Sequence, residues 1–319
     1  MVTTDPRNKE LSIIIQVDGG IGRVICSIPA IERLAQREPD RKIIIITTHP
    51  DVFKENPSIH RVYNLTSNYL WDDVIKHGEF VYTEPYYNYL YYTQKHHLIQ
   101  AFDLLINGSE ELETPTLYLT KEEVKWGEKL IEDIRKDHNK PVGVLQCFGA
   151  GAFIDGDKEF KDESCRSLFP NQVEMLMDEL TDAAIFVNAS HIPIDFTNVW
   201  QQQFTMRQLF SVIKASDFVV TVDSFSSHVG ACFQKPGILI LGATHKENVA
   251  YPHYQLIQRQ GYPKGYSPNR FGGEIERHDD RAMCFSEEEL KDLAKDISDL
   301  ITTQEGIRTL APEVPEKDA

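Results

Sequence analysis

The sequence predicts an α/β fold of two facing Rossmann-like domains with parallel sheets. Apolar strands alternate with helices in two series, the first starting with the strand at 11–17 and the second with the strand at 142–146. Continuous apolar strands that alternate with helices are typical of parallel sheets covered on both faces. A polar segment that ends in Pro141 separates the two series, which predicts a domain boundary there.

The size and composition of the chain suit two soluble domains. With 319 residues, we expect an amino-terminal domain over 1–140, a carboxy-terminal domain over 141–301 and a loose polar tail over 302–319. Hydrophobic residues make up 41% of the chain, and no apolar run reaches the length of a membrane span, so we expect a cytoplasmic protein without a transmembrane segment. The net charge of −16 opposes binding to nucleic acid.

The first series opens with a strand, a glycine-rich turn and a helix. The turn after strand 11–17 contributes Asp18, Gly19, Gly20, Gly22 and Arg23. A helix over 24–37 and a second strand over 43–46 follow it. A Rossmann dinucleotide site places an acidic residue after the second strand to bind the ribose. This strand is followed by Thr47, Thr48 and His49, which disfavours a nicotinamide cofactor and an oxidoreductase function.

Tyrosines crowd the segment 63–97, with Tyr86, Tyr87 and Tyr89 near its centre. Each tyrosine offers a flat apolar face and one hydroxyl, which suits stacking on a sugar or a base. We therefore regard these three residues as acceptor-side candidates. The alternative is that the tyrosines pack at a domain surface.

The second series restarts the alternation of strands and helices. The strand at 142–146 leads into a loop of small residues that includes Gly149, and a charged insert follows over 153–163. Arg166 is the cation of the next run, before a helix over 171–180 and a strand over 184–188. Residues 188–191 follow the carboxyl end of the strand at 184–188, where open α/β sheets bind ligands. From the residues alone, Arg166 can equally be a solvated surface arginine.

The most informative stretch is the strand at 218–222 and the turn that follows it. Asp223 and Ser224 can each cap a helix, and small or polar residues come next: Ser226, Ser227 and His228. The free N–H groups at such a helix start form an anion site that suits a phosphate group. The imidazole of His228, one helical turn beyond the cap, would reach the same anion. The alternative is a buried strand-to-helix turn in which Asp223 serves only as a cap.

The segment 218–244 resembles the carboxy-terminal signature of the ADP-heptose:lipopolysaccharide heptosyltransferase family, glycosyltransferase family 9. Both contain an apolar strand, an Asp-led turn with a histidine five residues further on, a small-residue helix, Lys-Pro, a second strand and a small turn that ends in threonine, here Thr244. Residues 22–30 also resemble the start of the first helix in that family. The resemblance implies the GT-B fold and a donor site formed by Asp223, Ser224, Ser226, Ser227, His228, Arg166, Gly149 and Thr244.

The resemblance also implies an activity. A family member would move a sugar from a nucleotide-diphosphate sugar to an acceptor hydroxyl, with inversion and with no metal or other cofactor. The carboxy-terminal domain would bind the donor, and the amino-terminal domain would bind a saccharide or glycolipid acceptor.

Arg23 departs from the family pattern, because it stands where the family carries the aspartate proposed as the catalytic base. Asp18, five residues earlier on the same turn, is the nearest carboxylate and is our candidate for the catalytic base; the alternative is that it only hydrogen-bonds its own turn. Two further functions stay open. One is a viral-type DNA-base glycosyltransferase, which the tyrosines favour and the net charge opposes. The other is a sugar-nucleotide-binding protein without transferase activity.

Overall fold

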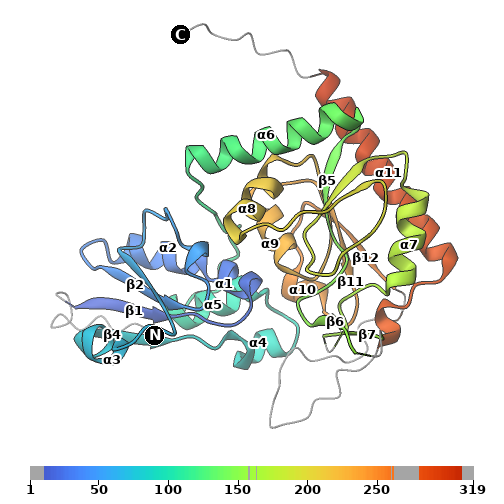
Figure 1. The fold of residues 1–319 in the computed structure, drawn as a ribbon. Coiled ribbons are helices and arrows are strands. Elements are labelled where there is room, and N and C mark those ends of the chain that lie inside the picture. Colours follow the sequence, from blue (N-terminus) through green and yellow to red (C-terminus); the bar gives the residue numbers. More distant parts are fainter. Residues whose placement is uncertain (1–10, 157–158, 163, 260, 262–279, 311–319) are drawn as a thin grey trace, which may run out of the picture.

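The computed structural model of the chain describes residues 11–156, 159–162, 164–259, 261 and 280–310. Two lobes, each with a parallel sheet at its centre, lie side by side (Figure 1). In the described residues the two large sheets share no strand, and all their strand pairings are parallel. The predicted α/β fold of two Rossmann-like units with parallel sheets is therefore confirmed.

The sheet of the first lobe has the strand order β3-β2-β1-β4. Its strands are β1 Ser12–Gln16, β2 Ile43–Thr47, β3 Arg61–Asn64 and β4 Gly78–Tyr82. The isoleucine runs of β1 and β2 are largely buried, as expected for strands covered on both faces. The edge strand β4 lies in the tyrosine-rich segment, where no strand was predicted. Its side chains are only partly buried, so it lacks the continuous apolar run that marks a central strand.

The predicted helix at 24–37 is two helices, α1 Ile21–Cys26 and α2 Ile28–Arg37. Pro29 lacks an N–H group and its ring clashes with the carbonyl four residues earlier, so a continuous helix cannot pass through it. Ser27 sits at the break and donates its hydroxyl to the carbonyl of Val24 at 2.7 Å. The break leaves α1 as a short helix whose first turn follows directly from the glycine turn.

Helix α3 lies between β3 and β4 of the first sheet, and helices α4 to α6 connect the two sheets. These helices are α3 Leu70–Asp73, α4 Tyr89–Tyr92, α5 Leu98–Asn107 and α6 Lys121–His138. Short 3-10 turns accompany them at Pro50–Val52, Ile75–His77 and Pro85–Tyr87. Although α6 precedes the predicted boundary at 140, it packs against α8 of the second lobe.

The sheet of the second lobe has the strand order β12-β11-β10-β5-β8-β9. Its strands are β5 Val142–Gln146, β8 Ile185–Asn188, β9 Val199–Trp200, β10 Val219–Val222, β11 Gly237–Leu241 and β12 Tyr254–Gln258. The charged insert forms a separate antiparallel hairpin of β6 Ala152–Ile154 and β7 Phe160–Asp162. Strand β10, which leads into the signature turn, lies between β11 and β5 inside the sheet.

Helices cover both faces of the second sheet. They are α7 Pro170–Glu179, α8 Met206–Ala215, α9 Phe225–Cys232, α10 Lys246–Val249 and α11 Glu287–Leu310, with a 3-10 turn at Asp280–Met283. In Figure 1, α8 and α9 lie on the side toward the first lobe, and α7 and α11 lie on the other side. Because α11 continues to Leu310, residues 302–310 are helical and not the loose tail we expected; residues 311–319 lie outside the described part.

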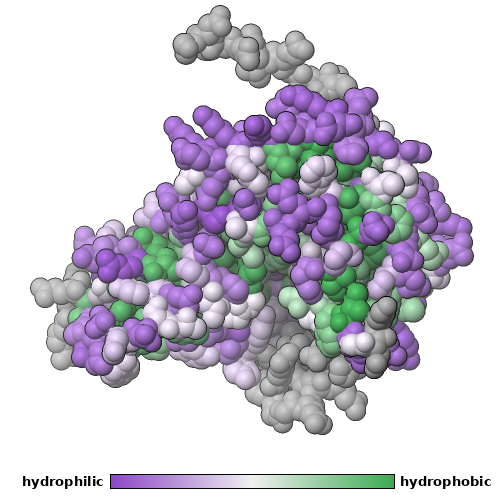
Figure 2. Space-filling model, viewed as in Figure 1, coloured by the Kyte–Doolittle hydropathy of each residue, from purple (hydrophilic) through white to green (hydrophobic). Residues whose placement is uncertain are grey.

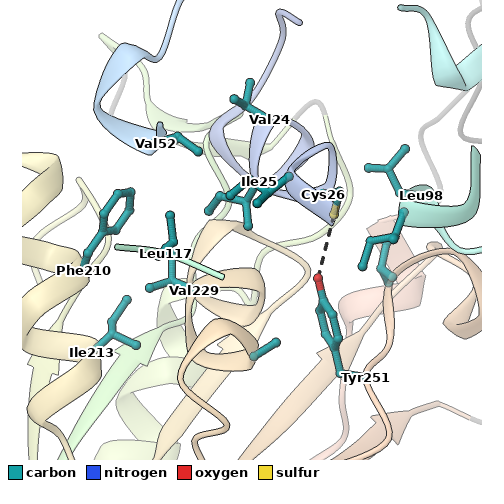
Figure 3. Packing of buried hydrophobic residues seen from close by; sticks show 14 of the residues in the cluster. Val24, Ile25, Cys26, Val52, Leu98, Leu117, Phe210, Ile213, Val229 and Tyr251 are labelled. Carbon is teal, nitrogen blue, oxygen red and sulfur yellow. Dashed lines mark hydrogen bonds between the residues drawn. The ribbon is translucent and has the colours of Figure 1, made fainter. Parts of the chain in front are cut away.

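A hydrophobic cluster crosses from one lobe to the other. It joins Ile25 and Cys26 of α1 to Val229 of α9 and to Tyr251. Figure 3 shows these residues packed together, with the Tyr251 hydroxyl 3.8 Å from the Cys26 sulfur. The contact between α1 and α9 therefore fixes how the carboxyl edges of the two sheets meet.

The outer surface is mainly polar. On the face shown in Figure 2, hydrophilic residues predominate over both lobes. Exposed aromatic residues of the first lobe include Tyr69, Trp71, Tyr87 and Tyr89. Among the described helices, none combines the length and apolar character needed to cross a bilayer.

Candidate functional site

A pocket of about 230 Å³ lies between the two lobes, where the glycine turn after β1 meets the signature turn after β10. The first lobe lines it with Gly20, Ile21, Gly22, Arg23, Tyr86, Tyr91 and Leu98. The second lobe lines it with Ala150, Arg166, Asp223, Ser224, Phe225, His228, Thr244 and Val249. The pocket thus brings the two turns that the sequence singled out, 200 residues apart, to one place.

The start of α9 forms part of the pocket wall. Ser224 is the N-cap of α9 with an extended backbone, and its side chain makes no capping hydrogen bond. Ser227 donates its hydroxyl to the carbonyl of Ser224 at 2.7 Å, and the N–H of Ser226 donates to Oε1 of Gln146 at 3.2 Å. Ser226 and Ser227 are fully buried beneath the pocket and do not line it. Of the three serines, only Ser224 is placed to contact a ligand directly.

Asp223 links two other donor-site candidates. Its Oδ2 accepts a hydrogen bond from the Thr244 hydroxyl at 2.8 Å and lies 3.5 Å from Nη1 of Arg166. The carboxylate is therefore engaged by a hydroxyl and a cation, and only 5% of the residue is exposed. This arrangement orients Arg166 and Thr244 toward the pocket.

The loop that carries Arg166 is held by the charged insert. At the end of β7, Asp162 accepts hydrogen bonds from the N–H groups of Arg166 and Ser167, at 3.0 and 2.8 Å. The Ser167 hydroxyl in turn accepts the N–H of Gly149 at 2.8 Å. Gly149 therefore holds the Arg166 loop through its N–H group and does not itself line the pocket. Its neighbour Ala150 lines the pocket.

His228 lines the pocket but is also part of the contact between the lobes. Its Nδ1 lies 2.8 Å from the Tyr251 hydroxyl and 3.4 Å from the sulfur of Cys26. Burial is the main cause that lowers the pKa of His228 to about 4. Two smaller effects act in opposite directions: the Asp223 carboxylate raises this pKa and the Arg166 guanidinium lowers it. The imidazole is therefore neutral at pH 7 and can act as a hydrogen-bonding group there, not as a cation.

The glycine turn places Arg23 in the pocket wall. Gly19 has φ +95°, and a Cβ added to it would come within 2.9 Å of Cδ of Arg23. Nη2 of Arg23 donates to the carbonyl of Thr83 and to Oε2 of Glu84, both at 3.1 Å. The guanidinium carbon lies 4.7 Å from the centre of the Tyr86 ring. Glycine at position 19 thus leaves the room in which the arginine side chain lies.

Asp18 lies beside the pocket and not in its lining. Its Oδ2 accepts a hydrogen bond from Nε2 of Gln16 at 3.1 Å, and its Oδ1 lies 3.9 Å from Nη2 of Arg23. The Asp18 carboxylate therefore lies next to Arg23 of the pocket wall.

The three acceptor-side tyrosines lie in different environments. Tyr86 lines the pocket and stacks on Tyr91 with ring centres 5.5 Å apart. Tyr87 and Tyr89 are exposed, at 58% and 70%, and do not line the pocket. The structure thus brings Tyr86 to the site and leaves the other two on the surface of the first lobe.

Solved structures with similar folds were found at low sequence identity. A family 9 glycosyltransferase from Veillonella parvula DSM 2008 matches with a TM-score of 0.65 and 12% identity, over 92% of this chain and 98% of that one. The ADP-heptose lipopolysaccharide heptosyltransferase II of E. coli matches with a TM-score of 0.63 and 10% identity, over 92% of this chain and all (100%) of that one. The chain has the fold of these glycosyltransferases.

The same GT-B fold is found in the E. coli heptosyltransferase WaaC with ADP, which matches with a TM-score of 0.51 and 13% identity, over 77% of this chain and 93% of that one. No protein-family model and no curated protein sequence matches the chain. The structural comparison thus leads to the same family that the signature segment resembles. At these identities it shows the fold, and the chemistry has to be argued from the pocket.

Several residues of the GT-B pocket were missed by sequence reasoning. Glu84 holds Arg23, Tyr251 holds His228, and Tyr91 and Leu98 line the wall. Tyr91 and Leu98 lie in α4 and α5, and Glu84 and Tyr251 lie outside helices and strands. These segments meet the signature turns only through the fold. The proline and tyrosines near Glu84 mark a turn, but no sequence pattern pairs that turn with the glycine turn.

No group of three or more His, Cys, Asp or Glu side chains that could hold a metal ion is found in the part of the chain that the structure describes. The expectation of a metal-free site remains a prediction.

Proposed function

We propose that the protein is a glycosyltransferase that moves a sugar from a nucleotide-diphosphate sugar to an acceptor hydroxyl. The single observation that carries this proposal is the pocket between the lobes, because it joins the N-terminal start of α9, Arg166 and the glycine turn at the carboxyl edges of two parallel sheets. Ligands of open α/β sheets bind at that edge, and helix starts bind phosphate.

In this proposal the donor diphosphate lies against Ser224 at the start of α9, with Arg166 as its cation. The N–H groups of the helix start and the guanidinium stabilise the negative charge that develops on the leaving diphosphate. Such stabilisation supplies the role that a metal ion has in other transferases, so we propose a metal-independent reaction. We propose inversion because the signature segment resembles that of family 9. Asp223 and Thr244 act by holding Arg166 and closing the turn.

We choose the donor and acceptor classes of this proposal from those of the structurally similar heptosyltransferases. One WaaC structure is described with ADP and another with ADP-2-deoxy-2-fluoro heptose. An ADP-linked sugar is therefore the first donor to test, and a saccharide or glycolipid is the acceptor class that we propose. The attacking hydroxyl would come from the side of the first lobe, next to Tyr86.

The donor proposal is tested by thermal shift of the whole chain with ADP-, GDP-, UDP- and CMP-linked sugars. A ligand that binds the native state raises the melting temperature, so one class of nucleotide sugar should give a clear shift. Asp223→Ala should reduce that shift, because Arg166 and Thr244 both lose their partner, while the variant should still melt cooperatively. Absence of a shift with every nucleotide sugar would refute the proposal.

A second candidate, a sugar-nucleotide-binding protein without transfer activity, is favoured by one observation. Among the lining residues that the structure describes, the only carboxylate is Asp223, and it is engaged by Thr244 and Arg166. The two candidates differ in donor hydrolysis: a transferase slowly transfers its sugar to water and releases the nucleoside diphosphate. Binding of the donor without any release above the uncatalysed rate would favour the second candidate.

A further inference from the structure

Arg23 is a buried cation whose hydrogen-bonding capacity is only partly used. It lines the pocket, and only 8% of the residue is exposed. Nη2 makes its contacts with Thr83 and Glu84, whereas Nε is buried without a partner among the described residues. In the same part of the chain, Nη1 makes no hydrogen bond. Since an arginine has five N–H donors and stays charged, several donors are left for a ligand.

The surroundings of Arg23 hold the guanidinium in one place. Glu84 binds one end through a 3.1 Å ion pair, and the Tyr86 ring lies against its plane at 4.7 Å. The N–H of Tyr86 also donates to Oε1 of Glu84 at 3.3 Å, so the carboxylate is itself oriented. A cation that is fixed before binding loses little entropy when a ligand arrives.

Arg166 and the start of α9 line the same pocket from the second lobe. Arg166 is paired with Asp223 at 3.5 Å, as Arg23 is paired with Glu84. Among the described lining residues, one arginine therefore comes from each lobe. A ligand with two linked anionic groups matches this pair, and a diphosphate is such a ligand.

We infer that Arg23 binds a phosphate oxygen of the nucleotide diphosphate from the first lobe, opposite Arg166 and the start of α9. This rests on the proposed function and deepens it. Arginine forms short, charge-assisted and often bidentate hydrogen bonds with phosphate oxygens. The residue at the position of the family aspartate therefore stabilises the leaving group and takes no part in proton transfer. The first lobe is then part of the donor site and does not serve the acceptor alone.

The test is calorimetric titration of the whole chain with ADP, GDP and UDP and with the matching nucleosides. Arg23→Gln should weaken binding of the nucleoside diphosphate about 10- to 100-fold, the value expected for losing charge-assisted hydrogen bonds. Affinity for the nucleoside should not change. Arg37→Gln is the matched control, because it removes the same charge from the exposed end of α2 away from the pocket, and it should leave both affinities unchanged.

A second variant guards against misfolding of Arg23→Gln, which leaves Glu84 without its cation. The double variant Arg23→Gln/Glu84→Gln removes both charges and should show the same loss of diphosphate affinity. Glu84→Gln alone should lose less affinity than either Arg23 variant, because its amide oxygen still accepts a hydrogen bond from Arg23. Unchanged diphosphate affinity in either folded Arg23 variant would overturn the inference and leave the proposed function standing. An equal loss in Arg37→Gln would also overturn it. Failure of the natural chain to bind any nucleoside diphosphate or nucleotide sugar would reject the proposed function itself.

Discussion

Burial decides the charge of the two histidines nearest the pocket. The pKa of His228 is lowered to about 4, and that of His97 to about 3, in both cases mainly by burial. Their rings contact Tyr251 edge to face, at 5.7 and 5.1 Å between centres. Both side chains are therefore neutral parts of the interface between the lobes at pH 7.

We predict that the protein loses stability as the pH falls from about 6.5 toward 4. The ordinary histidine pKa is 6.5, so in this window the unfolded state binds protons that the folded state does not. Unfolding then becomes easier by on the order of 1 kcal/mol per pH unit for each buried histidine. Urea denaturation at pH 7 and pH 5 measures the difference.

The matched variants are His228→Asn and His138→Gln. Removing the buried His228 should flatten the pH dependence, while removing the exposed His138 at the end of α6 should leave it as in the natural chain. A natural chain with equal stability at both pH values would contradict the prediction. An NMR titration of the His228 ring would then measure whether its pKa in the folded protein is lowered.

We predict that Asp18→Asn lowers transfer about 100-fold or more once a donor and an acceptor are known, as expected for loss of a general base. The structure places Asp18 beside Arg23 at 3.9 Å, where the amide keeps the shape of the side chain and cannot accept the proton. Turnover is measured together with donor affinity and melting temperature, which should stay unchanged. Full turnover by the amide variant would exclude Asp18 as the base.

At the scale of elements, the contact between α1 and α9 determines how the lobes meet. Gly22 of α1 faces the ring of His228 on α9, and a Cβ at position 22 would lie 2.5 Å from its Cδ2. At an exposed position inside a helix, replacing glycine by alanine stabilises the protein by about 1 kcal/mol. Whether alanine at position 22 stabilises or destabilises the protein therefore depends on the contact with His228.

We predict that Gly22→Ala destabilises the protein by about 1–3 kcal/mol, the usual cost of overpacking a tight core contact. Gly20→Ala is the matched control in the same turn, because Gly20 has φ −69° and no atom lies within 4 Å of its added Cβ. Chemical denaturation of both variants provides the comparison. Equal stability of the two would mean that α1 and α9 do not meet as closely as the structure indicates.

At the scale of the whole molecule, a few buried polar side chains tie the lobes together. Asn248 of α10 donates to the carbonyls of Tyr91 and His96, at 3.0 and 2.9 Å, and is fully buried. Arg207 of α8 reaches the carbonyls of Asp51 and Tyr118. These contacts complement the apolar cluster by fixing one relative orientation of the lobes.

We predict that Asn248→Ala costs about 2–4 kcal/mol of stability, because the buried carbonyl of His96 loses its donor and that of Tyr91 keeps only a backbone donor. It should also increase the radius of gyration of the unliganded chain in small-angle scattering, since the lobes lose a fixed contact. Asn171→Ala, on the exposed start of α7, is the control and should change neither quantity. If Asn248→Ala has the same stability and the same radius of gyration as the natural chain, other contacts hold the lobes together.

The sequence predicted the buried strands of the fold better than the partly exposed ones. Strands β1, β2, β5, β8, β10 and β11 are continuous apolar runs and were predicted close to their observed bounds. Strand β4 and the hairpin of β6 and β7 were not predicted, because their side chains are partly exposed and they form through pairing with a neighbour. The split between α1 and α2 follows from Pro29, whereas the apolar pattern over 24–37 predicts a single helix.

The sequence by itself determined the two series of strands and helices and the small-residue turns after β1 and β10, because local hydrophobic pattern and backbone preference decide them. Only the tertiary structure decided which of these residues share a pocket. It placed Arg23 and Arg166 in one pocket and left Asp18 outside its described lining. It also buried Ser226 and Ser227 and kept Tyr87 and Tyr89 on the surface. Those outcomes depend on contacts such as Glu84 with Arg23 and Tyr251 with His228, which join segments far apart in the chain. Local preference carries no information about such pairings, since they form only when the packed lobes bring the segments together.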